Sequence, residues 1–299
     1  MSQAQNALRQ YAFIAESTFG VTPGTPQTQL FDPVSFDGDP QSEQLNSNTI
    51  RADRQLGFSR RGNQSAAGSM EVELCHAKYD SFLEAFTGGT WAANELLVGN
   101  TARSFAIEEG FTDLVQYRVF NGLMFDTFSV SITPEALVTG TFGFMGSGVS
   151  ALTGTSIDAT PTAITPKATY FHEGGTISEG GSTVAYVTGL QFEVKNNLAG
   201  SYALGSTSYR SIALGKVEVT GTVTALFESA TLANKYANNT ASSITATIGD
   251  GTNTMTFGFP DVRYTGLKMQ RAASGPVLVE LTFTGVYSTN TSFKISRSS

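Results

Sequence analysis

The chain of 299 residues is poor in the residue types that carry covalent, metal or redox chemistry. It contains one cysteine, two histidines and one tryptophan. A single cysteine cannot form a disulfide within the chain, so a disulfide-stapled secreted scaffold is excluded and folding in a reducing compartment is expected. His76 and His172 are far apart in the sequence, and no metal-ligand spacing is present. We therefore expect neither a metal ion nor a cofactor.

Signatures of membranes, nucleotides and nucleophilic catalysis are missing as well. No apolar run approaches the ~18 residues of a membrane-spanning helix. The polar segment Met1 to Gln10 lacks an apolar core, so we expect no signal peptide and no membrane insertion. The chain has no P-loop, no G-x-S-x-G motif and no G-x-G-x-x-G opening a helix. Cys75 has no accompanying His and Asn/Asp pattern, so it is interpreted as a strand residue rather than a catalytic thiol.

Charge is also scarce. Charged residues make up 14% of the chain, whereas 30 Ser, 38 Thr and 31 Gly supply most of its polarity. The net charge is −7, which argues against a protein that holds phosphate backbones by counterion release. When the chain is divided after residue 149, the first part has 16 acids and 8 bases and the second has 9 acids and 10 bases. The two halves thus carry charges of −8 and +1.

The dominant hydrophobic period is two, which is typical of half-solvated antiparallel strands. In Met70 to Leu74 one face is apolar and the other is acidic, and in Phe128 to Ile132 the polar face is serine. The same alternation continues through Leu190 to Lys195, Val217 to Thr224 and Val279 to Phe283. Only Lys78 to Phe86, which Gly88 follows, and Glu228 to Ala237 are predicted as helices. The sequence predicts a mainly β protein with two short helices.

The surroundings of the two predicted helices match. Each helix follows a glycine and an alternating strand, and each precedes two strands and a hairpin. This order indicates an internal duplication with a period of about 145 residues, the size of one domain. We predict a first domain over 1–146, a linker rich in Gly, Ser and Thr over 147–182 that holds one small hairpin at most, and a second copy over 183–299.

Residues 41–64 stand out as a long polar segment with no core pattern. Part of it concentrates four of the chain's eleven arginines, namely Arg51, Arg54, Arg60 and Arg61, together with Asp53. A nucleic-acid patch would need aromatic platforms, and Phe58 is the one aromatic residue available. Two interpretations stay open: a solvated loop, or an arm whose guanidinium groups meet carboxylates of a neighbouring subunit.

Two pairs of acids have spacings that a hydrolase could use. Glu71 and Glu73 share one strand face about 7 Å apart, a separation within the range of glycosidase acid and base groups. Glu108 and Glu109 lie in another predicted strand. Any alternating strand produces this geometry, however, and one tryptophan provides little sugar platform. The residues alone therefore favour a structural or binding protein, not an enzyme.

Several segments, in this order, resemble the major tail tube proteins of long, non-contractile-tailed bacteriophages. They cover nearly the whole chain, and none is diagnostic alone. They include Glu16-Ser-Thr-Phe-Gly-Val-Thr-Pro-Gly-Thr-Pro26, Ser47-Asn-Thr-Ile-Arg-Ala-Asp-Arg-Gln55, Gly68 to Leu74 with Tyr79 to Ala85, Ser104 to Phe111, Tyr117 to Gly122 and Val138 to Gly146.

The resemblance implies two tandem β-sandwich or barrel-like tube domains, each with one short flanking helix. It further implies a virion tail protein, assembled in the host cytoplasm, whose stacked rings form a channel that double-stranded DNA traverses during ejection without specific binding. Tape-measure, terminator and tail-tip proteins would be its other partners. Most members have one domain and form hexameric rings, so a duplicated chain implies a trimer with six pseudo-equivalent domains. Six chains with an external second domain are the alternative.

An acidic, hydroxyl-rich wall would repel DNA, whereas a basic wall would bind it and stall its transit. We therefore expect lumen residues among Glu71, Glu73, Glu218 and Glu280, because each is the polar alternate of a strongly patterned strand. Positions on the outer wall or in inter-subunit pairs are the alternative for each of them. A phage or cell-surface adhesin would have a similar composition and is the competing function, but it should expose aromatic ligand platforms.

Overall fold

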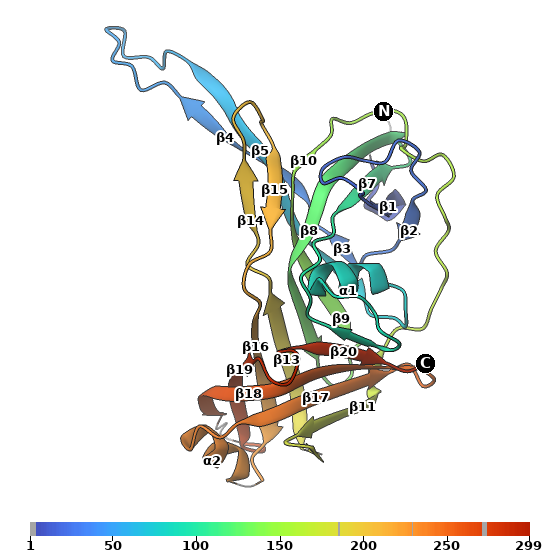
Figure 1. The fold of residues 1–299 in the computed structure, drawn as a ribbon, viewed down its shortest axis with the longest axis vertical. Helices are drawn as coiled ribbons and strands as arrows, with labels where there is room; N and C mark the ends of the chain where they lie inside the picture. The colour runs from blue at the N-terminus through green and yellow to red at the C-terminus, as the bar shows by residue number, and fades with distance from the viewer. Residues whose placement is uncertain (1–3, 185, 229, 271–273) are drawn as a thin grey trace.

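The alternating segments form long antiparallel strands in a computed structural model that describes residues 4–184, 186–228, 230–270 and 274–299. The molecule is elongated, and both termini lie on the same side (Figure 1). The side chain of His172 lies outside the described part. The mainly β class predicted from the sequence is confirmed, and the sheets of the described residues are not closed into barrels.

The first half of the chain contains a short 3-10 helix over Asn6–Leu8 and ten strands. The strands are β1 (Arg9–Ala15), β2 (Gln29–Phe31), β3 (Ser35–Phe36), β4 (Asp39–Asn46), β5 (Ser59–Glu73), β6 (Glu95–Leu97), β7 (Phe105–Phe111), β8 (Gln116–Ile132), β9 (Thr139–Gly146) and β10 (Gly148–Val149). The predicted strands at Tyr117 to Phe120 and Phe128 to Val130 are parts of the single strand β8.

The second half contributes ten more strands. They are β11 (Phe171–Glu179), β12 (Ser182–Thr183), β13 (Val187–Lys195), β14 (Ala199–Tyr202), β15 (Tyr209–Ala213), β16 (Glu218–Leu226), β17 (Ser242–Gly249), β18 (Thr254–Gln270), β19 (Leu278–Val286) and β20 (Lys294–Arg297). Strand β11 pairs with β17, so part of the segment predicted as a linker belongs to a sheet.

Both helices form close to the predicted bounds. Helix α1 (Asp80–Thr87) ends at Gly88, whose φ of 66° is the left-handed conformation expected of a glycine stop. It buries one face that includes Phe82 and Phe86. Helix α2 (Thr231–Ala237) buries only Leu232. Residue 229, within the predicted range of the second helix, lies outside the described residues.

One continuous ladder of strands runs through both halves of the chain. Its order is β4, β5, β9, β8, β13, β16, β19 and β18, with β3 extending β4 along the same side of β5. The pairing of β8 with β13 joins the halves. Strand β8 also leaves this ladder, because its N-terminal part pairs with β7 and β10. Strand β18 behaves in the same way with β17 and β20.

The same scheme of strand partners occurs in each half. In the first half β1, β7, β8, β9, β5 and β4 are successive neighbours, and in the second half β11, β17, β18, β19, β16 and β13 are. Helix α1 contacts β8, as α2 contacts β18. The strands β8 and β18 each span 17 residues.

Irregularities in the ladders recur at matching positions. The β8–β9 register shifts between Phe125 and Thr127, and the β18–β19 register shifts between Tyr264 and Gly266. Each position in the second pair follows its counterpart by 139 residues (125 to 264, 127 to 266). Because a bulge turns the following side chains to the other face, matching bulges keep the same faces of β8 and β18 polar.

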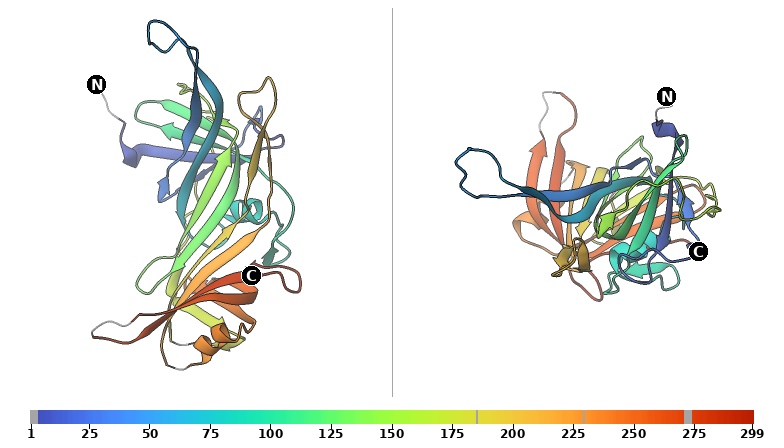
Figure 2. Two further views of the ribbon diagram at one scale, coloured as in Figure 1. Left: turned by 90° about the vertical axis from the view of Figure 1, so that its left-hand side faces the viewer. Right: turned by 90° about the horizontal axis from the view of Figure 1, so that it is seen from above.

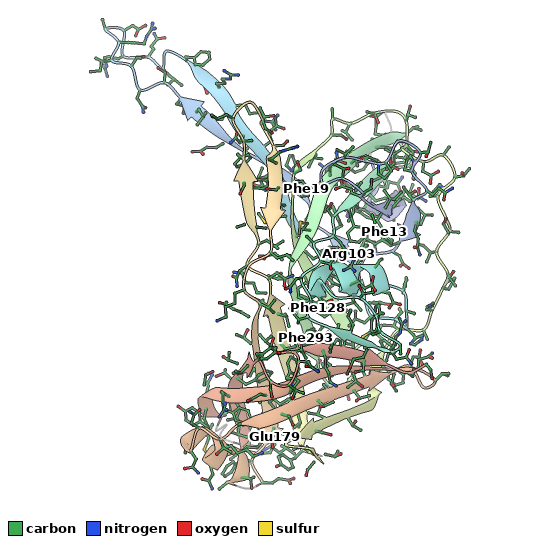
Figure 3. All side chains as sticks on the ribbon, viewed as in Figure 1. Phe13, Phe19, Arg103, Phe128, Glu179 and Phe293 are labelled. Atoms are coloured by element: carbon green, nitrogen blue, oxygen red, sulfur yellow. The ribbon has the colours of Figure 1, made fainter. Side chains whose placement is uncertain are left out.

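The core is one cluster of buried side chains in which phenylalanine dominates. Phe128 connects its two parts, since its ring centroid lies 4.6 Å from that of Phe142 in the first half and 6.3 Å from that of Phe192 in the second. Phe192 in turn lies 5.8 Å from Phe293. Figure 3 labels Phe128 and Phe293 near the level at which the two halves meet. The halves therefore share their apolar interior.

Candidate functional site: a hydroxyl-rich sheet face

The side of the main ladder that faces away from the core is polar over both halves. Direct cross-strand pairs link Glu71 to Thr141, Thr141 to Ser129, and Ser129 to Glu193. The row then continues through Thr220 and Thr284. A second row runs through Glu73, Thr139, Ser131, Gln191, Thr222 and Thr282. We call the face formed by these two rows the hydroxyl face.

The hydroxyl face follows from strand geometry. Side chains of directly opposed residues project to the same side of a sheet, and alternate residues along a strand do so as well. On β8, Ser129 and Ser131 are therefore on the polar side, whereas Phe128 and Val130 are buried. Val194 and Val219 are buried in the same way on β13 and β16. The period of two in the sequence thus divides each strand between the core and this face.

All four acids singled out in the sequence lie on this side of the ladder. Glu71 and Glu73 belong to its two rows. Glu218 is opposite Lys195, two residues beyond Glu193 on β13. Glu280 is opposite Thr224, two residues beyond Thr222 on β16. The register therefore brings the four acids to one face, although they come from three strands.

Sequence reasoning missed Glu193 and Lys195 as members of the same face. Both lie in an alternating segment that the sequence predicted, and their polar positions in that alternation were the available signal. Their neighbours across the strands, Ser129 and Thr127, become known only from the pairing of β13 with β8. Glu193 is exposed and adds a carboxylate between those of Glu71 and Glu218.

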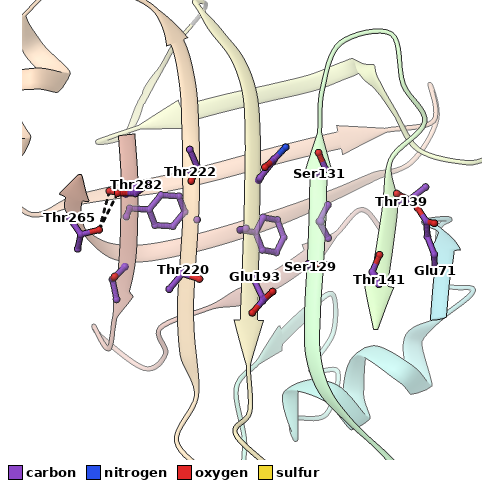
Figure 4. A pocket seen from close by; sticks show the side chains of 16 residues that line it. Glu71, Ser129, Ser131, Thr139, Thr141, Glu193, Thr220, Thr222, Thr265 and Thr282 are labelled. Carbon is purple, nitrogen blue, oxygen red and sulfur yellow. Dashed lines mark hydrogen bonds between the residues drawn. The ribbon is translucent and has the colours of Figure 1, made fainter. Parts of the chain in front are cut away.

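The face is shallowly concave, with a volume of about 640 Å³ (Figure 4). Hydroxyl groups make few contacts with one another: Thr265 Oγ1 and Thr282 Oγ1 are 3.3 Å apart. Glu73 accepts a hydrogen bond from Thr169 Oγ1 at 2.8 Å, and Glu280 accepts one from Gln270 Nε2 at 2.8 Å. Most of the hydroxyl and carboxylate groups are thus left to water.

Residues 41–64 form the outer part of a hairpin between β4 and β5. It projects away from the body of the molecule in both views of Figure 2. At its tip Arg51 forms an ion pair with Asp53, with Nη2 to Oδ2 at 2.5 Å. This hydrogen bond lowers the pKa of Asp53 and raises that of Arg51. Arg54 has a φ of 60°, and Arg60 and Arg61 lie on β5.

The tip of this arm also exposes apolar side chains. Ile50, Leu56 and Phe58 have exposed fractions of 102%, 60% and 63%. The arginine pattern in the sequence drew attention to the arm, but these three residues were not singled out as exposed contacts. Neighbouring exposed apolar side chains on a projecting segment are typical of a surface that another protein covers.

A second hairpin, β14 and β15, supports the base of the arm. The amide of Gln64 donates to the carbonyl oxygen of Thr207 at 2.6 Å, and Ser147 Oγ donates to that of Tyr209 at 3.2 Å. The rings of Tyr202 and Tyr209 stack with their centroids 4.4 Å apart. This hairpin comes from the second half of the chain and lies beside the first-half arm in Figure 1.

The other acid pair in the sequence is divided between two buried networks. Glu108 accepts hydrogen bonds from Ser156 Oγ and from the amide of Ile157, both at 2.7 Å. Glu109, whose side chain is 1% exposed, is bonded to two arginines and a tyrosine. Both carboxylates hold the fold together, and they do not face a common substrate position.

Other chemistry-bearing residues are similarly embedded. Burial raises the pKa of the Cys75 thiol, which disfavours its thiolate. Among the described residues no three His, Cys, Asp or Glu side chains are grouped as metal ligands. Neither helix in this part of the chain is long and apolar enough to cross a membrane.

A search of curated proteins found no match to the chain. A family model described as phage tail tube protein matches residues 6–286, which is nearly the whole chain and includes the hydroxyl face and the arm. The chain therefore belongs to the phage tail tube protein family, and it is a structural component of the virion tail.

Proposed function

We propose that copies of this chain form stacked rings whose hydroxyl faces line a channel for double-stranded DNA. The observation that carries the proposal is the continuity of this face. Serine, threonine and glutamate side chains occupy successive cross-strand positions from Glu71 to Thr284, through both halves of the chain. A single ladder of this width is suited to form one segment of a curved wall.

The charge of the face fits the passage of DNA. It carries five carboxylates, on Glu71, Glu73, Glu193, Glu218 and Glu280, and the lysines Lys195 and Lys268. Lys268 Nζ lies 3.9 Å from Glu280, which partly neutralises it. A wall of this sign repels the phosphate backbone and releases no counterions, so DNA is enclosed without being held.

We further propose that the chain contains two copies of one domain. The recurring strand partners, the bulges 139 positions apart and the matching helix contacts support it. Three chains would then supply six pseudo-equivalent units to a ring. Six chains with the second unit outside the ring would leave half of the hydroxyl face away from the channel, and the continuity of that face favours three.

The arm formed by residues 41–64 is proposed to bridge stacked rings or adjacent subunits. Its length, its exposed Ile50, Leu56 and Phe58, and its arginines provide both apolar and charged contacts. Because Arg51 is already paired with Asp53, Arg54, Arg60 and Arg61 are the arginines that would meet carboxylates of the acidic first half of a neighbour. Tape-measure, terminator and tail-tip proteins would bind the tube ends or its interior.

Electron microscopy of the purified protein tests the proposal. We expect rings or tubes with an open centre and three chains in each ring. In a helical reconstruction, Glu71, Glu73, Glu218 and Glu280 should line the channel. A protein that forms neither rings nor tubes under any assembly condition would contradict the proposed function, and tubes with all four acids on the outer wall would contradict the assignment of the lumen.

A further inference from the structure

The pairing of β8 with β13 shows how one half of the chain joins the other. Residues Thr127 to Ile132 of β8 pair antiparallel with Leu190 to Lys195 of β13, and Ser129 is opposite Glu193. This internal junction extends the hydroxyl face from the first half to the second. It provides a template for a junction between separate chains, if both of its edges have counterparts that lack a strand neighbour.

The counterpart of the β8 edge is the C-terminal part of β18. The bulges relate Thr127 to Gly266, 139 residues later, and the same interval relates Ser129 to Lys268. Residues 266–270 pair with β19 on one side. In the described part of the chain no strand pairs with them on the other side, where β13 would correspond.

The counterpart of β13 is the edge formed by β3 and β4. Met145 and Thr284, again 139 residues apart, pair with Ala67 and Thr220, respectively. Ala67 is opposite Asp39 and Thr220 is opposite Glu193. Asp39 therefore corresponds to Glu193. Among the described strands, β3 and β4 pair only with β5, so their outer side is a second unpaired edge.

We propose that the β18 edge of one chain pairs antiparallel with the β3–β4 edge of the next copy, with Lys268 directly opposite Asp39. The proposal rests on the ring assembly proposed above and specifies its register. The two edges differ, so the contact is head-to-tail and closes a ring when the rotation between copies allows it. The hydroxyl face then continues from chain to chain as it continues within one chain.

Charge supports this register. The side chain of Lys268 is 73% exposed, and Asp37 and Asp39 are both exposed on the other edge. In the internal junction the corresponding position pairs serine with glutamate, so a charge pair occurs only between chains. Opposite charges directly across two antiparallel strands stabilise their pairing. The acidic first half thus meets the more basic second half of a neighbour.

The backbone of the β3–β4 edge fits a specific, short contact. The amide of Asp37 donates to the carbonyl oxygen of Ser69 on β5, so alternate residues from Asp37 onward bond inward and Pro40 has its nitrogen outward. Proline at an edge removes one donor, which limits indiscriminate strand addition. Asp39 would form a non-hydrogen-bonded pair with Lys268, the kind in which the Cα atoms are about 4.5 Å apart.

Disulfide crosslinking can test the register, because the only native cysteine is buried. The variant with Asp39→Cys and Lys268→Cys places two thiols at a distance that a disulfide can span. After oxidation of assembled tubes, a non-reducing gel should show linked chains in a ladder that ends at the number of chains in a ring, three in the ring proposed. The control variant, Asp37→Cys with Lys268→Cys, displaces one thiol by two residues and should give at least tenfold less crosslinking.

Charge reversal provides a second test that does not depend on cysteine chemistry. Asp39→Lys alone should reduce tube formation at least tenfold, and addition of Lys268→Asp should restore it. Tubes that form normally with Asp39→Lys, or that crosslink equally or better in the control register, would overturn the proposed register and leave the ring assembly standing. Failure of the unmodified protein to form any ring would instead overturn the function on which the register rests.

Discussion

The guanidinium of Arg297 lies 4.3 Å from the centre of the Trp91 ring. The same arginine forms an ion pair with Asp80, in the first turn of α1. Arg297 is at the end of β20, which also pairs with β6, and Lys294 on that strand bonds Glu95 at 2.7 Å. The last strand of the chain therefore fastens the second half to the helix of the first.

Replacing Arg297 by alanine should loosen this attachment. We expect a loss of about 2 kcal/mol in unfolding free energy, because a cation–π contact and a partly buried charged hydrogen bond both disappear. Arg297→Lys should recover only part of it, since lysine retains the charge but not the planar group. Trp91 is the only tryptophan, so its fluorescence during urea unfolding reports directly on this contact. The exposed Arg210→Ala is the control and should change neither emission nor stability.

Glu109 makes a stronger prediction for stability. Its carboxylate receives Arg118 Nε at 2.6 Å, Arg9 Nη1 at 3.2 Å and the Tyr11 hydroxyl at 3.1 Å. Glu109→Ala would leave two partly buried cations without their partner and should cost about 3 kcal/mol or more. Glu95→Ala breaks a partly exposed pair and should cost about 1 kcal/mol or less. Equal losses in urea unfolding would contradict the structural role given to Glu109.

The sequence predicted which residues of a strand share a face, but not which strands are neighbours. Alternation correctly grouped Glu71 with Glu73 on one side of β5. The link from Glu71 to Glu193 passes through Thr141 and Ser129 and depends on long-range pairing. A shift of one residue would reverse every side chain, and no local pattern records that register.

The length of β8 was also beyond the local pattern. Gly122 has a φ of 66°, and the bulge near Asp126 interrupts the alternation, so the sequence appears to contain two short strands. The structure continues the strand because β7 and β10 pair with its first part and β9 and β13 with its second. The arm shows the opposite case: β4 is exposed along its whole length, so burial leaves no period of two in its sequence.

The buried tyrosines predict a dependence on alkaline pH. Burial raises the pKa of Tyr11, Tyr79, Tyr170 and Tyr264 above the ordinary value of about 10. Nearby carboxylates add to the effect, such as that of Glu179 beside Tyr264. The unfolded chain releases these protons at lower pH than the folded one, so their contribution to stability is complete below about pH 10 and is lost as the pH rises further.

Absorbance at 295 nm measures this difference. In a titration to about pH 11, the folded protein should show at least four fewer ionised tyrosines than the same protein in urea, out of ten in the chain. Glu179→Gln removes the negative charge that receives the Tyr264 hydroxyl and should lower the pKa of Tyr264. Coincident titration curves for folded and unfolded protein would contradict the burial of these side chains.

The arm predicts a separation between folding and assembly. Because Pro40 and Ala66 are paired, residues 41–64 can be replaced by an Asn-Gly turn without changing the strands below. The shortened protein should remain folded and soluble but should not polymerise into tubes, as size-exclusion chromatography and electron microscopy would show. Tubes of normal length from this variant would refute the bridging role of the arm.

Point substitutions at the arm tip narrow this prediction. Replacing Ile50, Leu56 and Phe58 by serine removes exposed apolar area without shortening the hairpin. We expect at least a tenfold rise in the protein concentration needed for tube formation, because the contact with a neighbour loses its apolar part. Leu152→Ser, at an exposed residue elsewhere, is the control and should leave that concentration unchanged. An unchanged threshold for the triple variant would assign the contact to the arginines.

The charge of the hydroxyl face predicts how DNA behaves in the tube. Changing Glu193, Thr220 and Thr222 to lysine makes the middle of this face basic, and tubes assembled with a short DNA duplex should then retain it. Retained DNA should resist nuclease and be released as salt increases, whereas tubes of the unmodified protein should retain none. Thr155→Lys with Thr160→Lys and Thr252→Lys adds lysines at exposed positions outside the face. DNA bound to that control should remain sensitive to nuclease, and equal protection in both variants would contradict a channel lined by the hydroxyl face.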